Sequence, residues 1–262
     1  MTQPTLDTIL EETRQRLPLL RECREQFEEA AAHRPSPSSF RRALLGPTLG
    51  LIAEIKRRSP SAGRIADLDP VTHARAYADG GASAISVLTN EPFFGGSLAD
   101  LTQVSRAVPT PLLRKDFILD EIQILEARSA GAAAVLLIVR ALSGGLLARL
   151  IEKTREIGLE PLVEVHTETE ITMALEAGAD ILGVNSRDLH TFTIDTPRAW
   201  SLFPLIPAHC VAIAESGMST VGDVTVAAVA GADAVLVGTA LSRLADPGAL
   251  VRQIRQVVRR GR

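Results

Sequence analysis

The phrase "AGADAVLVGT" at residues 230–239 is the last of four similar stretches along the chain. The others are "GGASAISVLT" (80–89), "AGAAAVLLIV" (130–139) and "AGADILGVNS" (177–186), so the phrase recurs after roughly 50 residues. In each stretch, a Gly-Ala pair ends a helical pattern. One or two residues then turn the chain, and an aliphatic run follows. Because glycine accepts the left-handed conformation that ends helices, each stretch predicts a helix end followed at once by a buried strand.

Four more aliphatic runs alternate with these strands, beginning at residues 49, 111, 159 and 210, which makes eight strands in all. Helices are predicted to begin at or beside Pro70, Ser97, Asp120, Ser143, Thr167, Thr196, Thr220 and Pro247. Strict alternation predicts a parallel sheet, and about 27 residues per unit fits a (β/α)₈ TIM barrel. An open, doubly wound sheet is the alternative, but the glycine-rich fingerprint usual after its first strand is absent.

The barrel is predicted over residues 49–262, and residues 1–48 are predicted to form an N-terminal helical extension of the same single domain. Residues 5–32 carry the helical pattern in this extension, and "RPSPSS" (34–39) interrupts it. At the other end, the basic residues of segment 252–262 alternate with apolar ones, which predicts the solvated face of a final helix.

Composition narrows the class of protein. Hydrophobic residues make up 46% and aromatic residues 3%, so the core must be aliphatic, and the net charge of −3 gives no electrostatic reason to expect a nucleic-acid partner. Cys23 and Cys210 are far apart and neither belongs to a CxxC pair, which fits a reducing cytoplasm. No stretch resembles a signal peptide or a membrane span, so a cytoplasmic protein without a membrane partner is predicted. The oligomeric state stays open, and a monomer is compatible with the sequence.

Polar residues interrupt the strands where each one ends. In "LGLIAEIKRRSPSAG" (49–63), Glu54 and Lys56 lie two residues apart, so their side chains share one face of the strand. The other strand ends contribute Lys115, Glu164, Asn185, Arg187, Glu215 and Ser216. In TIM barrels the carboxyl ends of the strands meet around the active site. Lysines and carboxylates that share one site shift each other's pKa, so these residues predict acid–base catalysis.

Two strand ends carry glycines in front of predicted helices, in "AESGMST" (214–220) and "VLVGTAL" (235–241). Barrels that bind phosphate commonly do so after their seventh and eighth strands, so Gly217, Gly238 and Thr239 are predicted to bind a phosphate group. No His, Asp or Glu residues show metal-ligand spacing, so neither a metal nor a cofactor is predicted. His166 is assigned to a loop or to a helix cap, and a Schiff base on Lys56 or Lys115 remains an alternative.

Seven blocks resemble the indole-3-glycerol phosphate synthase family in order and spacing, across residues 39–241. They are "IAEIKRRSPSAG", "VLTNEPFFGGS", "LRKDF", "LVEVH", "GVNSRDL", "AESG" and "VLVGTAL". Ser186 departs from the family, in which many members have a second asparagine. The resemblance implies a small phosphorylated substrate, 1-(2-carboxyphenylamino)-1-deoxyribulose 5-phosphate, which is closed to an indole with loss of carbon dioxide and water in tryptophan biosynthesis. It implies no cofactor and no metal.

The resemblance also implies roles for individual residues. Lys115 would protonate the ketone oxygen, Lys56 would hold the departing carboxylate with Glu54 beside it, and Glu164 would be a further acid–base group. Asn185 and Arg187 would orient the substrate, and Ser59, Glu215 and Ser216 would complete its binding site. The lining of the anthranilate ring is predicted to be Phe94, Phe117, Leu136 and Ile138.

Three rival functions fit a phosphate-binding barrel. Phosphoribosylanthranilate isomerase would be expected to have a Cys–Asp pair at its strand ends, but Cys210 opens a strand. A ribulose-phosphate epimerase would need metal-binding His and Asp residues, which the sequence does not offer. A non-catalytic barrel could bind a phosphorylated ligand, but it would have no use for Lys115 and Glu164 at strand ends.

Overall fold

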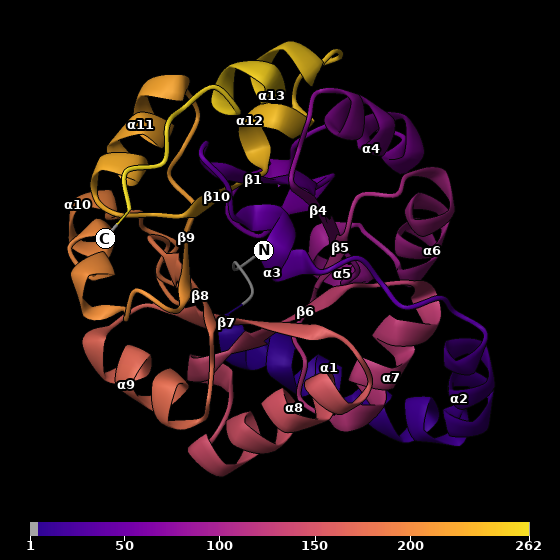
Figure 1. The fold of residues 1–262 in the computed structure, drawn as a ribbon. Helices are drawn as coiled ribbons and strands as arrows, with labels where there is room; N and C mark the ends of the chain where they lie inside the picture. Colours follow the sequence, from indigo (N-terminus) through magenta and orange to yellow (C-terminus); the bar gives the residue numbers. More distant parts are fainter. Residues whose placement is uncertain (1–4, 262) are drawn as a thin grey trace.

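Residues 5–261 are described by a computed structural model, in which eight parallel strands close into a barrel (Figure 1). Around the barrel, the order is β1 (Gly50–Ile55), β10 (Ala234–Val237), β9 (Val211–Glu215), β8 (Ile181–Asn185), β7 (Glu160–Val165), β6 (Ala134–Ile138), β5 (Leu112–Lys115) and β4 (Ala84–Leu88). Because β1 pairs with both β10 and β4, the sheet has no free edge. The predicted TIM barrel is confirmed, and the open sheet is excluded.

Helices follow the strands and form the outer ring in Figure 1. They are α4 (Pro70–Asp79), α6 (Leu98–Ala107), α7 (Glu121–Ala130), α8 (Gly144–Glu156), α9 (Glu168–Glu176), α10 (Thr196–Trp200), α11 (Val221–Val229) and α13 (Gly248–Ile254). Short helical turns stand in the loops: α5 (Glu91–Phe94), η1 (Val139–Ala141), η2 (Phe203–Leu205) and α12 (Thr239–Ser242).

The predicted helix starts agree with the structure to within one residue. Six of the eight residues are N-caps: Ser97, Asp120, Ser143, Thr167, Thr220 and Pro247. Pro70 and Thr196 are instead the first helical residues, because Asp69 and Asp195 accept the capping hydrogen bonds. The repeated glycines also behave as predicted, since Gly81, Gly131, Gly178 and Gly231 all have φ between 87° and 108°.

Between residue 5 and the barrel, the structure has three helices: α1 (Leu6–Glu22), α2 (Arg24–Ala32) and α3 (Phe40–Leu44). The helical pattern of residues 5–32 is therefore divided at Cys23, and residues 1–4 of the predicted extension lie outside the described residues. In Figure 1, α3 lies across the centre of the ring of strands. Glu160, at the start of β7, accepts hydrogen bonds from the Ser39 hydroxyl and the Arg41 amide. The helix α3 thus covers the amino-terminal end of the barrel and leaves the other end open.

A two-stranded hairpin, β2 (Arg58–Ser59) with β3 (Gly63–Arg64), follows β1 at the open end. It is anchored by Arg57, whose guanidinium contacts Asp100 of α6 at 2.6 Å. Among the described residues, no helix combines the length and the apolar character needed to cross a bilayer.

The basic carboxy-terminal segment differs from the prediction. The last helix ends at Ile254, and the residues beyond it return to the segment before β1, where the Leu49 amide donates to the Val257 carbonyl and the Arg259 amide to the Pro47 carbonyl. Arg255 hydrogen-bonds the Leu49 carbonyl, and Arg259 pairs with the buried carboxylate of Asp233 at 2.9 Å. The expectation of a solvated helix face is therefore wrong for these two arginines, although Arg252 does lie exposed on the helix. The final predicted residue, Arg262, lies outside the described part.

Arg259→Ala should lower the free energy of unfolding by about 2 kcal/mol, because it removes the guanidinium that pairs with the buried Asp233 carboxylate. The Ala212 amide, which still donates to Asp233, limits the loss. Arg252→Ala is the matched control and should change stability by less than about 0.5 kcal/mol. Urea unfolding of both variants measures the difference, and equal stabilities would contradict the assigned role of Arg259.

Candidate active site

A cavity of about 410 Å³ opens at the carboxyl ends of the barrel strands. The structure brings all sixteen residues singled out from the sequence to this one cavity. They are Glu54, Lys56, Ser59, Phe94, Lys115, Phe117, Leu136, Ile138, Glu164, Asn185, Arg187, Glu215, Ser216, Gly217, Gly238 and Thr239. Their placement follows from barrel closure, because strand ends that are far apart in the sequence meet in one ring. Their individual roles remain predictions.

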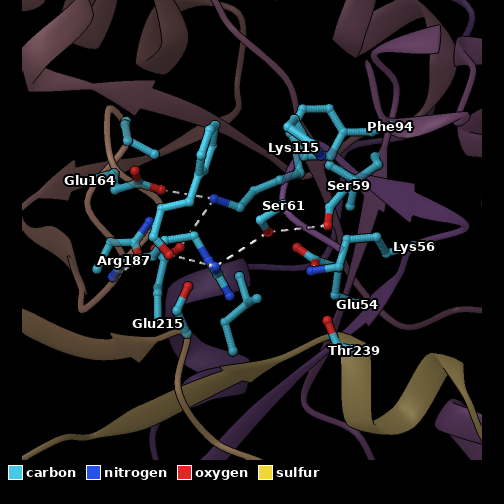
Figure 2. A pocket seen from close by; sticks show the side chains of 18 of the residues that line it. Glu54, Lys56, Ser59, Ser61, Phe94, Lys115, Glu164, Arg187, Glu215 and Thr239 are labelled. Carbon is cyan, nitrogen blue, oxygen red and sulfur yellow. Dashed lines mark hydrogen bonds and ion pairs between the residues drawn. The ribbon is translucent and has the colours of Figure 1, made fainter. Parts of the chain in front are cut away.

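The centre of the cavity is an ammonium group between two carboxylates (Figure 2). Lys115 Nζ, at the end of β5, lies 2.8 Å from Glu164 Oε2 on β7 and 3.1 Å from Glu215 Oε2 on β9. Both glutamates are almost completely buried. A buried charge is tolerated only when it is paired and hydrogen-bonded, so each member of this triad depends on the other two.

Burial and pairing shift the pKa values of the triad in different directions. Burial lowers the pKa of Lys115, but Glu164, Glu215 and Glu54 outweigh it and raise that pKa above its ordinary value. Burial raises the pKa of Glu164, but Lys115 and His166 bring it down to about 2. The pKa of Glu215 is raised to about 7, by burial first and then by the charge of Glu164, against the opposing effect of Lys115. One carboxylate is therefore charged while its neighbour binds a proton readily.

The two charged residues at the end of β1 form a second ion pair at the cavity. Lys56 Nζ lies 2.7 Å from Glu54 Oε1, and the Ser86 hydroxyl reaches Glu54 Oε2 at 3.5 Å. The Glu54 charge also contributes to the raised pKa of Lys115. The two ion pairs thus belong to one electrostatic unit at the cavity.

Two glycines make room for the buried carboxylates. A Cβ atom on Gly238 would lie 2.2 Å from Glu54 Oε1, and one on Gly183 would lie 2.0 Å from Glu215 Oε1. Gly238 was singled out only as a phosphate ligand, and Gly183 was not singled out at all. The signal was present, since Gly183 interrupts an aliphatic strand, where a glycine often marks a close approach.

The rim of the cavity is held by polar contacts between loops. Arg187 donates through Nη1 to Ser61 of the hairpin at 3.3 Å and to the Phe192 carbonyl at 3.0 Å, and its amide donates to Asn185 Oδ1. Ser216, after β9, has φ of 67°, an uncommon value for a residue with a side chain. Positive φ at such a position is a mark of functional sites, since surrounding contacts must hold it.

The apolar side of the cavity contains the predicted aromatic lining. The rings of Phe94 and Phe117 lie 6.2 Å apart between centroids at an angle of 39°, and Leu136 and Ile138 of β6 line the same cavity. Strand β5 ends at Lys115, so the loop after it, rather than the strand, brings Phe117 to the cavity. The result is an apolar surface beside an ammonium group.

Sequence reasoning missed several lining residues, among them Asn90, Leu189, Phe192, Ile194, Met218 and Ser219. Asn90 follows β4, the second barrel strand, and its polar side chain near a strand end was the available signal. Phe192 and Ile194 lie in the loop after β8, and apolar residues in a loop of polar neighbours were the available signal. Among the described residues, no group of three or more His, Cys, Asp or Glu side chains could hold a metal ion.

Comparison with known proteins identifies relatives over most of the chain. A family model described as "Indole-3-glycerol phosphate synthase" matches residues 6–254. A protein named indole-3-glycerol phosphate synthase from Mycobacterium avium is 49% identical over 230 residues, which cover 87% of this chain and 85% of that protein. A protein of the same name from Rhodococcus jostii is 52% identical over 219 residues, covering 83% of this chain and 81% of the relative.

Solved structures add information on the fold alone. A crystal structure of 3-hexulose-6-phosphate synthase covers 80% of this chain and all of its own chain, with a TM-score of 0.66 and 17% identity. A thiamine phosphate pyrophosphorylase from Pyrococcus furiosus has a TM-score of 0.62 at the same identity, covering 83% of this chain and 96% of its own. The family model and the close relatives carry the assignment, and the chain belongs to the indole-3-glycerol phosphate synthase family.

Proposed function

We propose that the cavity converts 1-(2-carboxyphenylamino)-1-deoxyribulose 5-phosphate to indole-3-glycerol phosphate, the reaction of a carboxy-lyase in tryptophan biosynthesis. Family membership supports the reaction. The observation that carries the residue assignments is the Lys115 ammonium held between two carboxylates at a cavity that also has an apolar side. A phosphorylated small molecule with one aromatic ring suits this combination of surfaces.

The first step is ring closure. The aromatic carbon that bears the carboxylate attacks the ketone carbon, a carbon–carbon bond forms, and the ketone oxygen gains a proton to become a hydroxyl. We assign that proton to Lys115, which is charged and lines the same cavity as Phe117, one of the residues proposed to hold the aromatic ring. Glu164 and Glu215 fix the position of the ammonium group before the substrate arrives.

The next two steps remove carbon dioxide and water. The carbon–carboxylate bond breaks, its electrons restore the aromatic ring, and Lys56 holds the departing carboxylate through its charge. The hydroxyl then leaves as water after accepting a proton, for which Lys56 is the donor with Glu54 as its partner. A proton is lost from the new ring in the same step, and Glu164, ionised at neutral pH, is the acid–base group that accepts it.

The remaining residues bind and orient. We assign the phosphate to Gly217, Gly238 and Thr239, which lie after β9 and β10, where TIM barrels commonly bind phosphate. Asn185 and Arg187 orient the polar chain of the substrate, with Ser59, Glu215 and Ser216 around it. The anthranilate ring lies against Phe94, Phe117, Leu136 and Ile138. A cytoplasmic location is part of this proposal and rests on the biosynthetic role of the relatives.

The isomerase alternative has no support in the site. Its expected cysteine would have to stand at a strand end of the cavity. Cys210 is buried directly before β9, at the amino-terminal end of the barrel. Neither Cys210 nor Cys23 lines the cavity.

The purified protein should convert the carboxyphenylamino-deoxyribulose phosphate to a fluorescent indole product in buffer that contains a chelator. Fluorescence emission follows the reaction, and chromatography against authentic product identifies it. Absence of turnover in a folded, homogeneous preparation would refute the proposed function. Abolition of turnover by the chelator would refute the metal-free chemistry.

Lys115→Met should lower kcat by about 100-fold or more, the contribution expected from a general acid, while substrate binding is retained. Lys153→Met on α8 is the matched control, because its side chain pairs only with Glu156 in the described part of the chain. Steady-state kinetics, with product titration as the binding assay, measures both variants. A rate near that of the wild type would exclude Lys115 as the acid.

The stability of Glu215→Gln relative to the wild type should be higher at pH 8 than at pH 5. The expected difference between the two pH values is on the order of 2 kcal/mol. The folded wild type holds a proton on Glu215 up to about pH 7, whereas an unfolded glutamate releases it near pH 4.5. The stability of the wild type therefore decreases as the pH rises from 4.5 to 7. Glutamine has no proton to lose.

The control for this prediction is Glu164→Gln, whose effect on stability should be nearly the same at pH 5 and at pH 8, because the pH range in which Glu164 titrates lies lower. The pKa of Glu164 is lowered on folding, so its charge adds stability above pH 4.5 that is lost as the pH falls toward 2. Urea unfolding at pH 5 and pH 8 measures both variants. The same pH trend in the two would contradict the division of charge between these glutamates.

A further inference from the structure

His166 lies directly behind Glu164 and outside the cavity. It follows β7 immediately, two residues after Glu164, so the two side chains leave the chain on the same side. Its side chain is 5% exposed, and its Nε2 atom lies 3.6 Å from Glu164 Oε1. Glu164 lines the cavity and His166 does not, so His166 can reach the substrate only through Glu164.

The other side of the ring is held by charged groups. Nδ1 lies 3.2 Å from Glu170 Oε2 on α9, and the same carboxylate oxygen accepts the His166 amide at 2.6 Å. Glu170 Oε1 in turn accepts from Arg140 of η1 at 3.1 Å, and Arg140 also pairs with Asp188 in the loop after β8. The ring is thus held by Glu170, which Arg140 links in turn to the loop after β8.

The two atoms that face each other are both buried. Glu164 Oε2 is engaged by Lys115, whereas Glu164 Oε1 and His166 Nε2 make no geometrically good hydrogen bond in the described part of the chain. Their separation of 3.6 Å is too long for a hydrogen bond, but catalytic contacts in unliganded sites often tighten when substrate binds. A buried polar atom without a hydrogen bond costs free energy. A proton on Nε2 would remove this cost for both atoms by forming a hydrogen bond to Glu164 Oε1.

We propose that His166 is a positioning residue for the reaction: its ring, anchored by Glu170, hydrogen-bonds Glu164 and holds that carboxylate in place against Lys115. The inference rests on the proposed function, in which Glu164 accepts a proton. Besides Glu164 and Glu170, the groups nearest to this unit are Arg140, which neutralises Glu170, and the Asn185 amide, which favours the ionised form of Glu164. The charges of Lys115 and His166 both lower the pKa of Glu164.

Two amide substitutions separate this role from a merely structural one. His166→Gln can place an N–H group near the position of Nε2 and still donate to Glu164, whereas His166→Asn reaches only as far as Nδ1 and keeps the contact with Glu170. Positioning of Glu164 predicts that the asparagine variant loses about 10-fold or more in kcat, with KM little changed, and that the glutamine variant loses less. A role confined to the α9 loop predicts the reverse order.

The pH profile gives a second readout. Both substitutions remove a group that can carry positive charge beside Glu164, so the acidic limb of the kcat profile should move to higher pH in both variants. His209→Gln, an exposed histidine before β9 at the other end of the barrel, is the matched control and should leave rate and profile unchanged. An asparagine variant with wild-type kcat and an unshifted limb would overturn the proposal, as would the reverse order of the two variants.

Nitrogen-15 NMR of the histidine rings tests the contact without turnover, which keeps this inference distinct from the proposed function. The His166 signals are identified by their loss in His166→Gln. Glu164→Gln should shift the His166 Nε2 signal and leave the other four histidines unchanged. Identical His166 signals in Glu164→Gln and wild type would overturn the inference, even in a protein that turns substrate over. A wild type without turnover, with the shift present, would instead count against the proposed function alone.

Discussion

Lys115 can stay charged inside the barrel mouth only because Glu164 and Glu215 flank it, and those three residues come from three separate strands. The ion triad therefore depends on the closed barrel, since an open sheet would not bring β5, β7 and β9 to one point. It also shapes its surroundings, because Gly183 and Gly238 have no side chains where the carboxylates of Glu215 and Glu54 need space. The small residues around the site are thus required by the space that the paired, buried carboxylates occupy.

Charged residues have different roles at the two ends of the barrel. At the amino-terminal end, charged groups close the structure: Glu160 binds α3, and Asp233 binds Arg259 of the final segment. At the carboxyl end, charged groups surround a cavity and form ion pairs with one another along its wall. Contacts that stabilise the fold therefore lie at the end of the barrel opposite the cavity. The cavity end can then hold groups with perturbed pKa values, such as Glu215.

The site combines surfaces that one anionic aromatic substrate requires. Two lysines and an arginine face three glutamates, and the raised pKa of Glu215 lets one of these carboxylates be neutral near pH 7. Binding of substrate carboxylate and phosphate is then not opposed by excess negative charge. The chain of contacts from Glu164 through His166 to Glu170 extends this control into the loops behind the cavity.

The sequence alone determined the number, order and type of the barrel elements, because glycine turns, helix caps and aliphatic runs are local properties. It also identified the polar residues at strand ends, since charges are conspicuous in apolar runs. It could not identify Gly183 as space for Glu215 or the return of Arg259 to Asp233. Those features join residues through strand register and loop path. Only tertiary packing decides them, because nothing local in the chain encodes which side chain lies opposite another.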